Sequence, residues 1–246
     1  HLIITGQILG FLDQEKRDLF SIVIQLGAIL AVCWVYRLRL WAVARSIHTW
    51  PAQKFVINLL VAFMPAAVIG VSAIGNIKHY LFHPVPVAIA LIVGGIAILW
   101  VERRTHTIRI QEVDEMTWRD ALKIGFAQSL ALFPGVSRSG ATILGGLMFG
   151  LSRKAATEFS FFLAIPVMFA ATILDVYKHR EQLSFDDVNI LLVGFAAAFV
   201  AGFAAVRILL RFVQNHDFSV FAWYRIGFGL LVLATGWFGW IDWSTG

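Results

Sequence analysis

The stretch "FPGVSRSGAT" carries the groups with which this sequence could do chemistry. It places Arg138 between the hydroxyls of Ser137 and Ser139, and Gly140 and Thr142 follow. An arginine guanidinium can bind two phosphate oxygens at once. Serine and glycine at the start of a helix leave backbone N–H groups that favour an anion. The residue types and their spacing therefore predict a phosphate-binding loop.

Two other interpretations of these residues stay open. Arg138 could form an ion pair with a carboxylate in the membrane or extend to the interface, although no acidic residue lies between Asp120 and Glu158. A buried guanidinium without such a partner costs about 2.5–3.5 kcal/mol on insertion scales. For each of the hydroxyls of Ser137, Ser139 and Thr142 alone, helix capping explains the residue at least as well as ligand binding does. The cluster as a whole favours a ligand.

The elements around this loop are predicted to cross a membrane. The chain has 246 residues, of which 59% are hydrophobic and 14% charged, and its mean hydropathy is +0.77. Runs of about 20 apolar residues predict membrane-spanning helices. Six such spans are expected, at Leu19–Tyr36, Phe55–Ile74, Val85–Val101, Ala155–Tyr177, Val188–Leu210 and Val220–Trp240. One cysteine, Cys33, excludes a disulfide framework and a cysteine-based metal site.

Two shorter apolar pieces, Ala121–Phe133 and Ala141–Leu151, flank the loop. Neither is long enough to span a bilayer. Non-helical backbone is tolerated at membrane depth only inside protein or beside water. The pair therefore predicts a re-entrant helix-loop-helix hairpin. We expect an all-α polytopic membrane protein in which residues 1–246 form a single membrane domain.

Positive charge indicates the orientation of the chain. Thirteen lysines and arginines collect on one side of the predicted spans and five on the other, while Arg138 and Arg225 lie within the membrane, accounting for all 20. The richer side, with the loops Arg37–Lys54 and Arg103–Arg119, is predicted to be cytoplasmic. The net charge of +5 is thus interpreted as a topology signal, and we expect no nucleic-acid partner.

The sequence also contains a weak internal repeat at an offset of 139 residues. Six identical pairs support it: Ile4/Ile143, Gly6/Gly145, Leu12/Leu151, Phe20/Phe159, Ser21/Ser160 and Ala31/Ala170. The two copies, about 1–101 and about 119–240, would cross the membrane in opposite directions. Such inverted repeats place a site near the bilayer midplane. The first hairpin would be truncated, because the partner of the arginine loop falls before residue 1.

Three further polar residues are candidates for this site. His1 aligns with Gly140 in the repeat and could transfer a proton near neutral pH, although a terminal histidine is otherwise uninformative. Gln25 could line the cavity or hydrogen-bond between helices. Arg225 is a possible second substrate contact, but a structural pair with Asp175 or Glu158 is the simpler interpretation.

The segment "SLALFPGVSRSGATILGGLMFGLSRKAATEFSFFLAIPVM" closely resembles the second signature of the undecaprenyl pyrophosphate phosphatase (bacitracin-resistance) family. The opening "HLIITGQILGFLDQEKRDLFSIVIQLGAILAV" resembles the region after that family's first signature, whose final histidine matches His1. "IVGGIAIL" and "FAWYRIG" extend the resemblance along the chain.

The resemblance implies hydrolysis of undecaprenyl diphosphate to undecaprenyl phosphate and inorganic phosphate. This reaction recycles the lipid carrier of cell-wall synthesis and gives bacitracin resistance. It implies a bacterial inner-membrane enzyme whose site faces the periplasm, and a divalent cation, Mg or Ca. His1 and Arg138 would be catalytic, and Ser137, Ser139, Gly140, Thr142 and Gln25 would bind substrate. The metal ligands would precede residue 1, so we expect activity to depend on residues absent from this chain.

The main alternative comes from another functional class. Inverted repeats and broken helices also describe secondary transporters, so the same cavity could serve a lipid-phosphate flippase. The sequence leaves open whether a water or a serine attacks the phosphate, and whether the chain forms a homo-oligomer.

Overall fold

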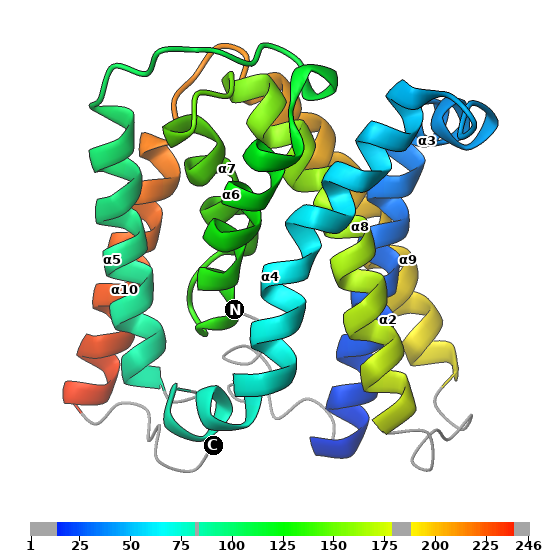
Figure 1. The fold of residues 1–246 in the computed structure, drawn as a ribbon. Coiled ribbons are helices and arrows are strands. Elements are labelled where there is room, and N and C mark those ends of the chain that lie inside the picture. The colour runs from blue at the N-terminus through cyan, green and yellow to red at the C-terminus, as the bar shows by residue number, and fades with distance from the viewer. Residues whose placement is uncertain (1–13, 82–83, 179–187, 239–246) are drawn as a thin grey trace. The chain divides into compact units, whose positions relative to one another are not determined.

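The computed structural model describes residues 14–81, 84–178 and 188–238, which are helical apart from short connections (Figure 1). The α-helices are α2 (Gln14–Val35), α3 (Arg37–Arg45), α4 (Trp50–Leu81), α5 (Pro84–Glu102), α6 (Trp118–Ser129), α7 (Arg138–Met148), α8 (Arg153–Lys178), α9 (Val188–Phe212) and α10 (Ser219–Trp237). Two 3₁₀ turns, η1 (Val113–Glu115) and η2 (Leu130–Leu132), flank α6.

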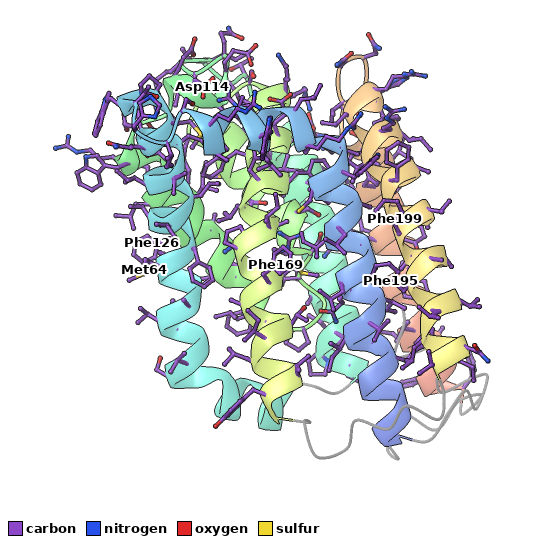
Figure 2. All side chains as sticks on the ribbon, turned by 90° about the vertical axis from the view of Figure 1, so that its right-hand side faces the viewer. Met64, Asp114, Phe126, Phe169, Phe195 and Phe199 are labelled. Carbon is purple, nitrogen blue, oxygen red and sulfur yellow. The ribbon has the colours of Figure 1, made fainter. Side chains whose placement is uncertain are left out.

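Five described helices are long and apolar enough to cross a bilayer, and the bent pair α2–α3 can supply a sixth span. The chain is therefore an all-α multi-pass membrane protein, as the sequence predicts. Large apolar side chains cover its outside. Met64 and Phe126, for example, are 54% and 59% exposed and point outward (Figure 2). Soluble monomers rarely expose large apolar surfaces of this kind.

Two details differ from the predicted spans. The basic segment expected as a loop after the first span is partly helical, because α3 continues from α2 at an angle of 71°. In addition, α4 extends to Leu81, whereas apolar composition predicted an end near Ile74. Polar residues after Ile74 therefore continue the helix beyond the apolar run.

Contacts divide the described helices into two compact units. Unit 1 comprises His1–Arg45 and Ala164–Leu209. Within it α2 packs closely on α9, and small residues allow the approach. A Cβ atom at Gly27 would lie 2.6 Å from the carbonyl oxygen of Phe195. Each unit takes segments from both halves of the chain, so the units do not coincide with the two predicted repeats. The repeat and the single domain stay predictions.

Unit 2 comprises Ser46–Leu163 and Leu210–Gly246, and it contains the arginine loop. Within it α5 packs along α10, α4 packs on α6, and α6 and α7 form a helix-loop-helix hairpin. Figure 1 shows this hairpin between the α5–α10 pair and α4. The helix break predicted around Arg138 is therefore present, and neighbouring helices surround the hairpin.

Residues 103–117 lie over one end of unit 2, called the loop end below; Asp114 marks it in Figure 2. This connection is attached to the helices beneath it. The Asn58 amide donates to the carbonyl oxygen of Met116 over 3.0 Å, and both residues are buried. Arg109 forms an ion pair with Asp120 at 3.1 Å. The entrance of the α6–α7 hairpin is thus covered at the loop end.

A buried carboxylate joins three helices at the same end. Glu102, at the end of α5, forms a bidentate ion pair with Arg153 at the start of α8. It also accepts the backbone N–H of Phe218, just before α10, over 3.0 Å. These bonds satisfy the carboxylate, which is only 4% exposed. These bonds fix the beginning of α8 relative to α5 and α10.

Candidate active site

The tip of the hairpin depends on a glycine. Gly135 has a φ of +89°, a conformation that other residues rarely adopt. A Cβ atom there would also lie 2.6 Å from the carbonyl oxygen of Val87 on α5. Pro134 cannot continue the preceding helix. The Pro-Gly pair therefore turns the chain tightly against α5 before α7 begins.

Ser137 caps α7, as the sequence predicts. Its side-chain oxygen accepts the backbone N–H of Gly140 over 3.1 Å, and its hydroxyl lies 3.2 Å from that of Ser139. The first N–H groups of a helix have no partner within the helix. The backbone N–H groups of Arg138 and Ser139 are therefore available to an anion at the start of α7.

Arg138 begins this helix, and no acidic side chain among the described residues forms an ion pair with it. Its Nη1 atom is buried and has no hydrogen-bond partner in the described part of the chain. The described ion pairs involve other cations, so the alternative of a membrane carboxylate finds no support among these residues. A buried guanidinium N–H that no protein group satisfies suits a bound anion.

The Thr142 side chain lies next to Ser160 of α8 and is only 1% exposed. Its Oγ1 donates toward the carbonyl oxygens of Arg138 and Ser139, at 3.0 and 3.1 Å. It also lies 2.6 Å from the hydroxyl of Ser160 on α8. Protein atoms thus engage this hydroxyl. Direct contact between Thr142 and a phosphate stays a prediction.

Two further site residues were predicted, His1 and Gln25. His1 falls outside the described residues. Gln25 is a half-buried residue of α2 in unit 1. Of the seven predicted site residues, the structure thus brings together Arg138, Ser137, Ser139, Gly140 and Thr142 around the start of α7. A site shared with His1 and Gln25 stays a prediction.

Arg225 holds the hairpin tip from the side of α10. Its Nη2 atom donates to the carbonyl oxygens of Gly135 and Ala90, at 2.9 and 3.3 Å. A Cβ atom at Gly94 would collide with the guanidinium, so this glycine makes room for it. The sequence had suggested Asp175 or Glu158 as partners. The bonds found instead go to backbone carbonyls, which is an arrangement that residue types alone do not indicate.

Sequence reasoning missed one buried polar residue of the hairpin. Gln128 on α6 is 2% exposed, and neither polar atom of its amide has a hydrogen-bond partner among the described residues. Buried amides normally have partners. An available signal was the isolated glutamine in the otherwise apolar "FAQSLALF".

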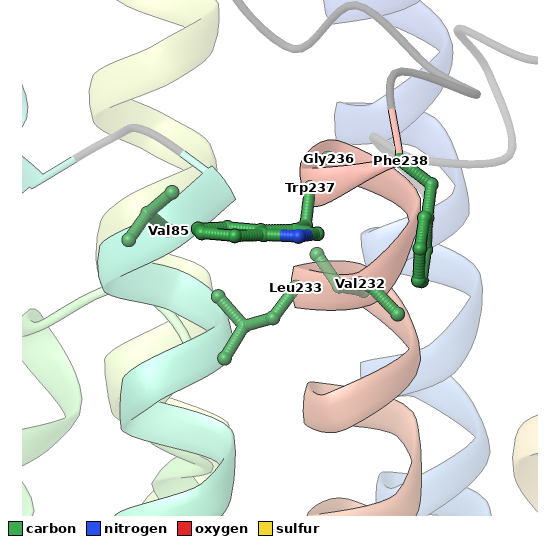
Figure 3. Close-up of a pocket in the computed structure, with 7 residues that line it drawn as sticks. Val85, Val232, Leu233, Gly236, Trp237 and Phe238 are labelled. Carbon is green, nitrogen blue, oxygen red and sulfur yellow. The ribbon is translucent and has the colours of Figure 1, made fainter.

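An apolar pocket lies at the end of unit 2 opposite the loop end, where α5 begins and α10 finishes (Figure 3). Its volume is about 560 Å³. It is lined by Val85, Val232, Leu233, Ala234, Gly236, Trp237 and Phe238. None of these side chains is ionisable, so the pocket lacks a charged group to pair with a phosphate. The arginine loop remains the candidate for that role.

Comparisons with known proteins identify the family. Residues 1–231 match the family model of the bacitracin resistance protein BacA. The chain belongs to this family. The family membership confirms the resemblance drawn from the two signature regions.

Named relatives match the chain over nearly its whole length. A protein from Nitrosomonas europaea named undecaprenyl-diphosphatase is 61% identical over 99% of this chain and 89% of its own length. One from Rhodospirillum rubrum, named undecaprenyl-diphosphatase 2, is 62% identical with the same coverage. One from Chromobacterium violaceum, named undecaprenyl-diphosphatase 1, is 55% identical over 99% of this chain and 91% of its own length.

Proposed function

We propose that this protein is an undecaprenyl-diphosphatase of the bacterial inner membrane. It hydrolyses undecaprenyl diphosphate to undecaprenyl phosphate and inorganic phosphate, which returns the lipid carrier to cell-wall synthesis. Removing the diphosphate also gives bacitracin resistance. The observation that carries this proposal is Arg138, whose buried Nη1 atom has no protein partner among the described residues. It stands at the start of α7 in a chain whose relatives bear this enzyme's name.

The loop chemistry fits a diphosphate substrate. Hydrolysis breaks the bond between the terminal phosphorus and the bridging oxygen, and negative charge develops on that oxygen. Arg138 and the free N–H groups at the start of α7 stabilise this charge. Ser137 and Ser139 orient the phosphates for attack. His1 protonates the leaving oxygen or assists the nucleophile. The role of Arg138 is the same whether a water or a serine attacks.

A divalent cation, Mg or Ca, is part of the proposal. The residues around Arg138 offer neutral hydroxyls and a cationic guanidinium but no carboxylate, which is the usual protein ligand of Mg or Ca. Among the described residues, no group of three or more His, Cys, Asp or Glu side chains lies together. The described residues therefore do not supply a cluster of three such ligands for the cation.

We propose that the diphosphate enters from the outer, periplasmic face. This proposal is supported by side-chain packing at the loop end, where Met116 and Leu151 are 0% exposed and Val101 is 2% exposed. The positive-inside count makes this end cytoplasmic. A charged headgroup would then reach the hairpin tip from the opposite side, while the prenyl tail stays in the lipid between helices.

The decisive experiment measures phosphate release from detergent-dispersed undecaprenyl diphosphate by the full-length protein. Arg138→Lys keeps the charge but loses the planar fork, so kcat should fall by about 100-fold or more. Arg104→Lys is the matched control, because Arg104 stacks on Trp100 at the loop end and should retain wild-type activity. Near wild-type release by correctly inserted Arg138→Lys protein would refute the bidentate role.

The same protein in sealed vesicles separates hydrolysis from transport. Translocation of undecaprenyl phosphate without phosphate release would replace the proposed phosphatase with the flippase alternative. Phosphate release without translocation supports the enzyme.

A further inference from the structure

Two buried hydroxyls connect α8 to the first turn of α7. Ser160 Oγ and Thr142 Oγ1 lie 2.6 Å apart, and the two residues are 2% and 1% exposed. In the described part of the chain, the Ser160 hydroxyl has no other hydrogen-bond partner. This pair lies directly behind the loop that carries Arg138.

The direction of this bond follows from counting protons. A hydroxyl has one O–H donor and can accept through its lone pairs. Thr142 is placed to donate its proton to the carbonyl oxygen of Arg138 or Ser139. Ser160 must then donate to Thr142. The result is a chain of buried bonds from Ser160 through Thr142 to the backbone of the two residues that begin α7.

The support beneath this chain is rigid. The α8 residues around Ser160 are tightly packed, with Phe159 1% and Leu163 0% exposed. The start of α8 is also fixed by the ion pair between Arg153 and Glu102. Apart from the Ser137 cap, the first turn of α7 is prone to fray, because its first backbone N–H groups have no partners within the helix. A fixed donor on α8 therefore restrains the turn from which the Arg138 side chain projects.

We propose that Ser160 is a positioning residue for the reaction. Acting through Thr142, it holds the backbone of Arg138 and Ser139 in the geometry that binds the diphosphate. This inference rests on the proposed phosphatase function, because it assigns Ser160 a part in that same site. Ser160 itself touches no substrate.

Thr157 provides a matched control one turn earlier on α8. It is 0% exposed, and its hydroxyl donates to the carbonyl oxygen of Arg153 in its own helix over 2.8 Å. Thr157→Val and Ser160→Ala both remove a buried hydroxyl from α8. Only Ser160→Ala removes a bond to α7.

The kinetic test compares these variants in the full-length protein. Ser160→Ala should lower kcat roughly tenfold and change KM less than about twofold, since misplaced catalytic groups slow the chemical step. Thr157→Val should leave kcat unchanged. Ser160→Cys, with a weaker donor of similar size, should give an intermediate kcat. Thr142→Val combined with Ser160→Ala should cost little more than Thr142→Val alone, because both act through one chain of bonds.

A second readout does not depend on catalysis. Amide hydrogen exchange of residues 133–142 should be faster in Ser160→Ala than in wild type, and unchanged in Thr157→Val. If wild type releases no phosphate, the proposed function fails while this readout still tests the link from Ser160 to the loop. Unchanged exchange with unchanged kcat in Ser160→Ala, or equal loss in both variants, would overturn the inference.

Discussion

Arg138 and Arg225 both belong to unit 2, but their surroundings differ. Arg138 presents a buried Nη1 atom with no described partner. Arg225 also has one buried nitrogen, Nε, with no described partner, but its Nη2 atom donates to the carbonyls of Gly135 and Ala90. The first arrangement suits a ligand and the second suits a support for the turn. The same residue type thus serves two purposes within one unit.

The role of Arg225 can be tested by changing its neighbour Gly94 as well as Arg225 itself. A methyl group at Gly94 would collide with the guanidinium, so Gly94→Ala should displace Arg225 from the Gly135 carbonyl. We expect Gly94→Ala and Arg225→Lys to lower kcat by similar factors of about 3–10, both milder than Arg138→Lys. Phosphate release and detergent-phase thermal unfolding measure this. Full activity in Gly94→Ala would argue against a positioning role for Arg225.

At the scale of elements, the entrance of the hairpin depends on a capping box at the start of α6. The Thr117 side chain accepts the backbone N–H of Asp120, and the Asp120 carboxylate accepts the Thr117 backbone N–H over 3.1 Å. Burial by itself raises the pKa of Asp120. Hydrogen bonds from Thr117 and the charge of Arg109 outweigh burial, so the pKa of Asp120 is lowered.

This lowered pKa predicts how stability depends on pH. A carboxyl group with a lower pKa in the folded state stabilises the fold above its unfolded pKa of about 3.9, and this contribution disappears as pH falls through the folded value. Asp120→Asn should therefore lower the melting temperature at pH 7, and this difference should shrink as the pH falls below about 3.9. Thermal unfolding of both proteins in detergent across this range measures the difference. A constant gap at all pH values would contradict the assignment.

How far the sequence determines these elements varies with the interaction. Apolar run length located the spans, and Pro134 with Gly135 located the helix break, because both are local properties of the chain. The bonds from Arg225 to carbonyls and from Ser160 to Thr142 join residues distant in sequence, and any residue can supply a carbonyl. In the sequence, Ser160 stands out only as one member of the identical pair Ser21/Ser160 in the weak repeat. The length of the apolar run likewise gave no indication of the bend between α2 and α3.

At the scale of the whole molecule, orientation is the property to test. After Cys33 is replaced, a single cysteine at position 45 should be labelled only from the cytoplasmic side, and one between residues 178 and 187 only from outside. Membrane-impermeant maleimide on intact cells, with and without permeabilisation, distinguishes the two. Outside labelling at position 45 would reverse the topology and with it the proposed route of the substrate.

The packing of Met116, Leu151 and Val101 at the loop end has a pharmacological consequence. If the only approach to Arg138 is from the opposite face, a competitive inhibitor never needs to cross the cytoplasmic membrane. Highly charged diphosphate mimics, which are usually discarded because they do not permeate lipid, would then be suitable compounds. Their potency against spheroplasts should follow their potency against the purified enzyme.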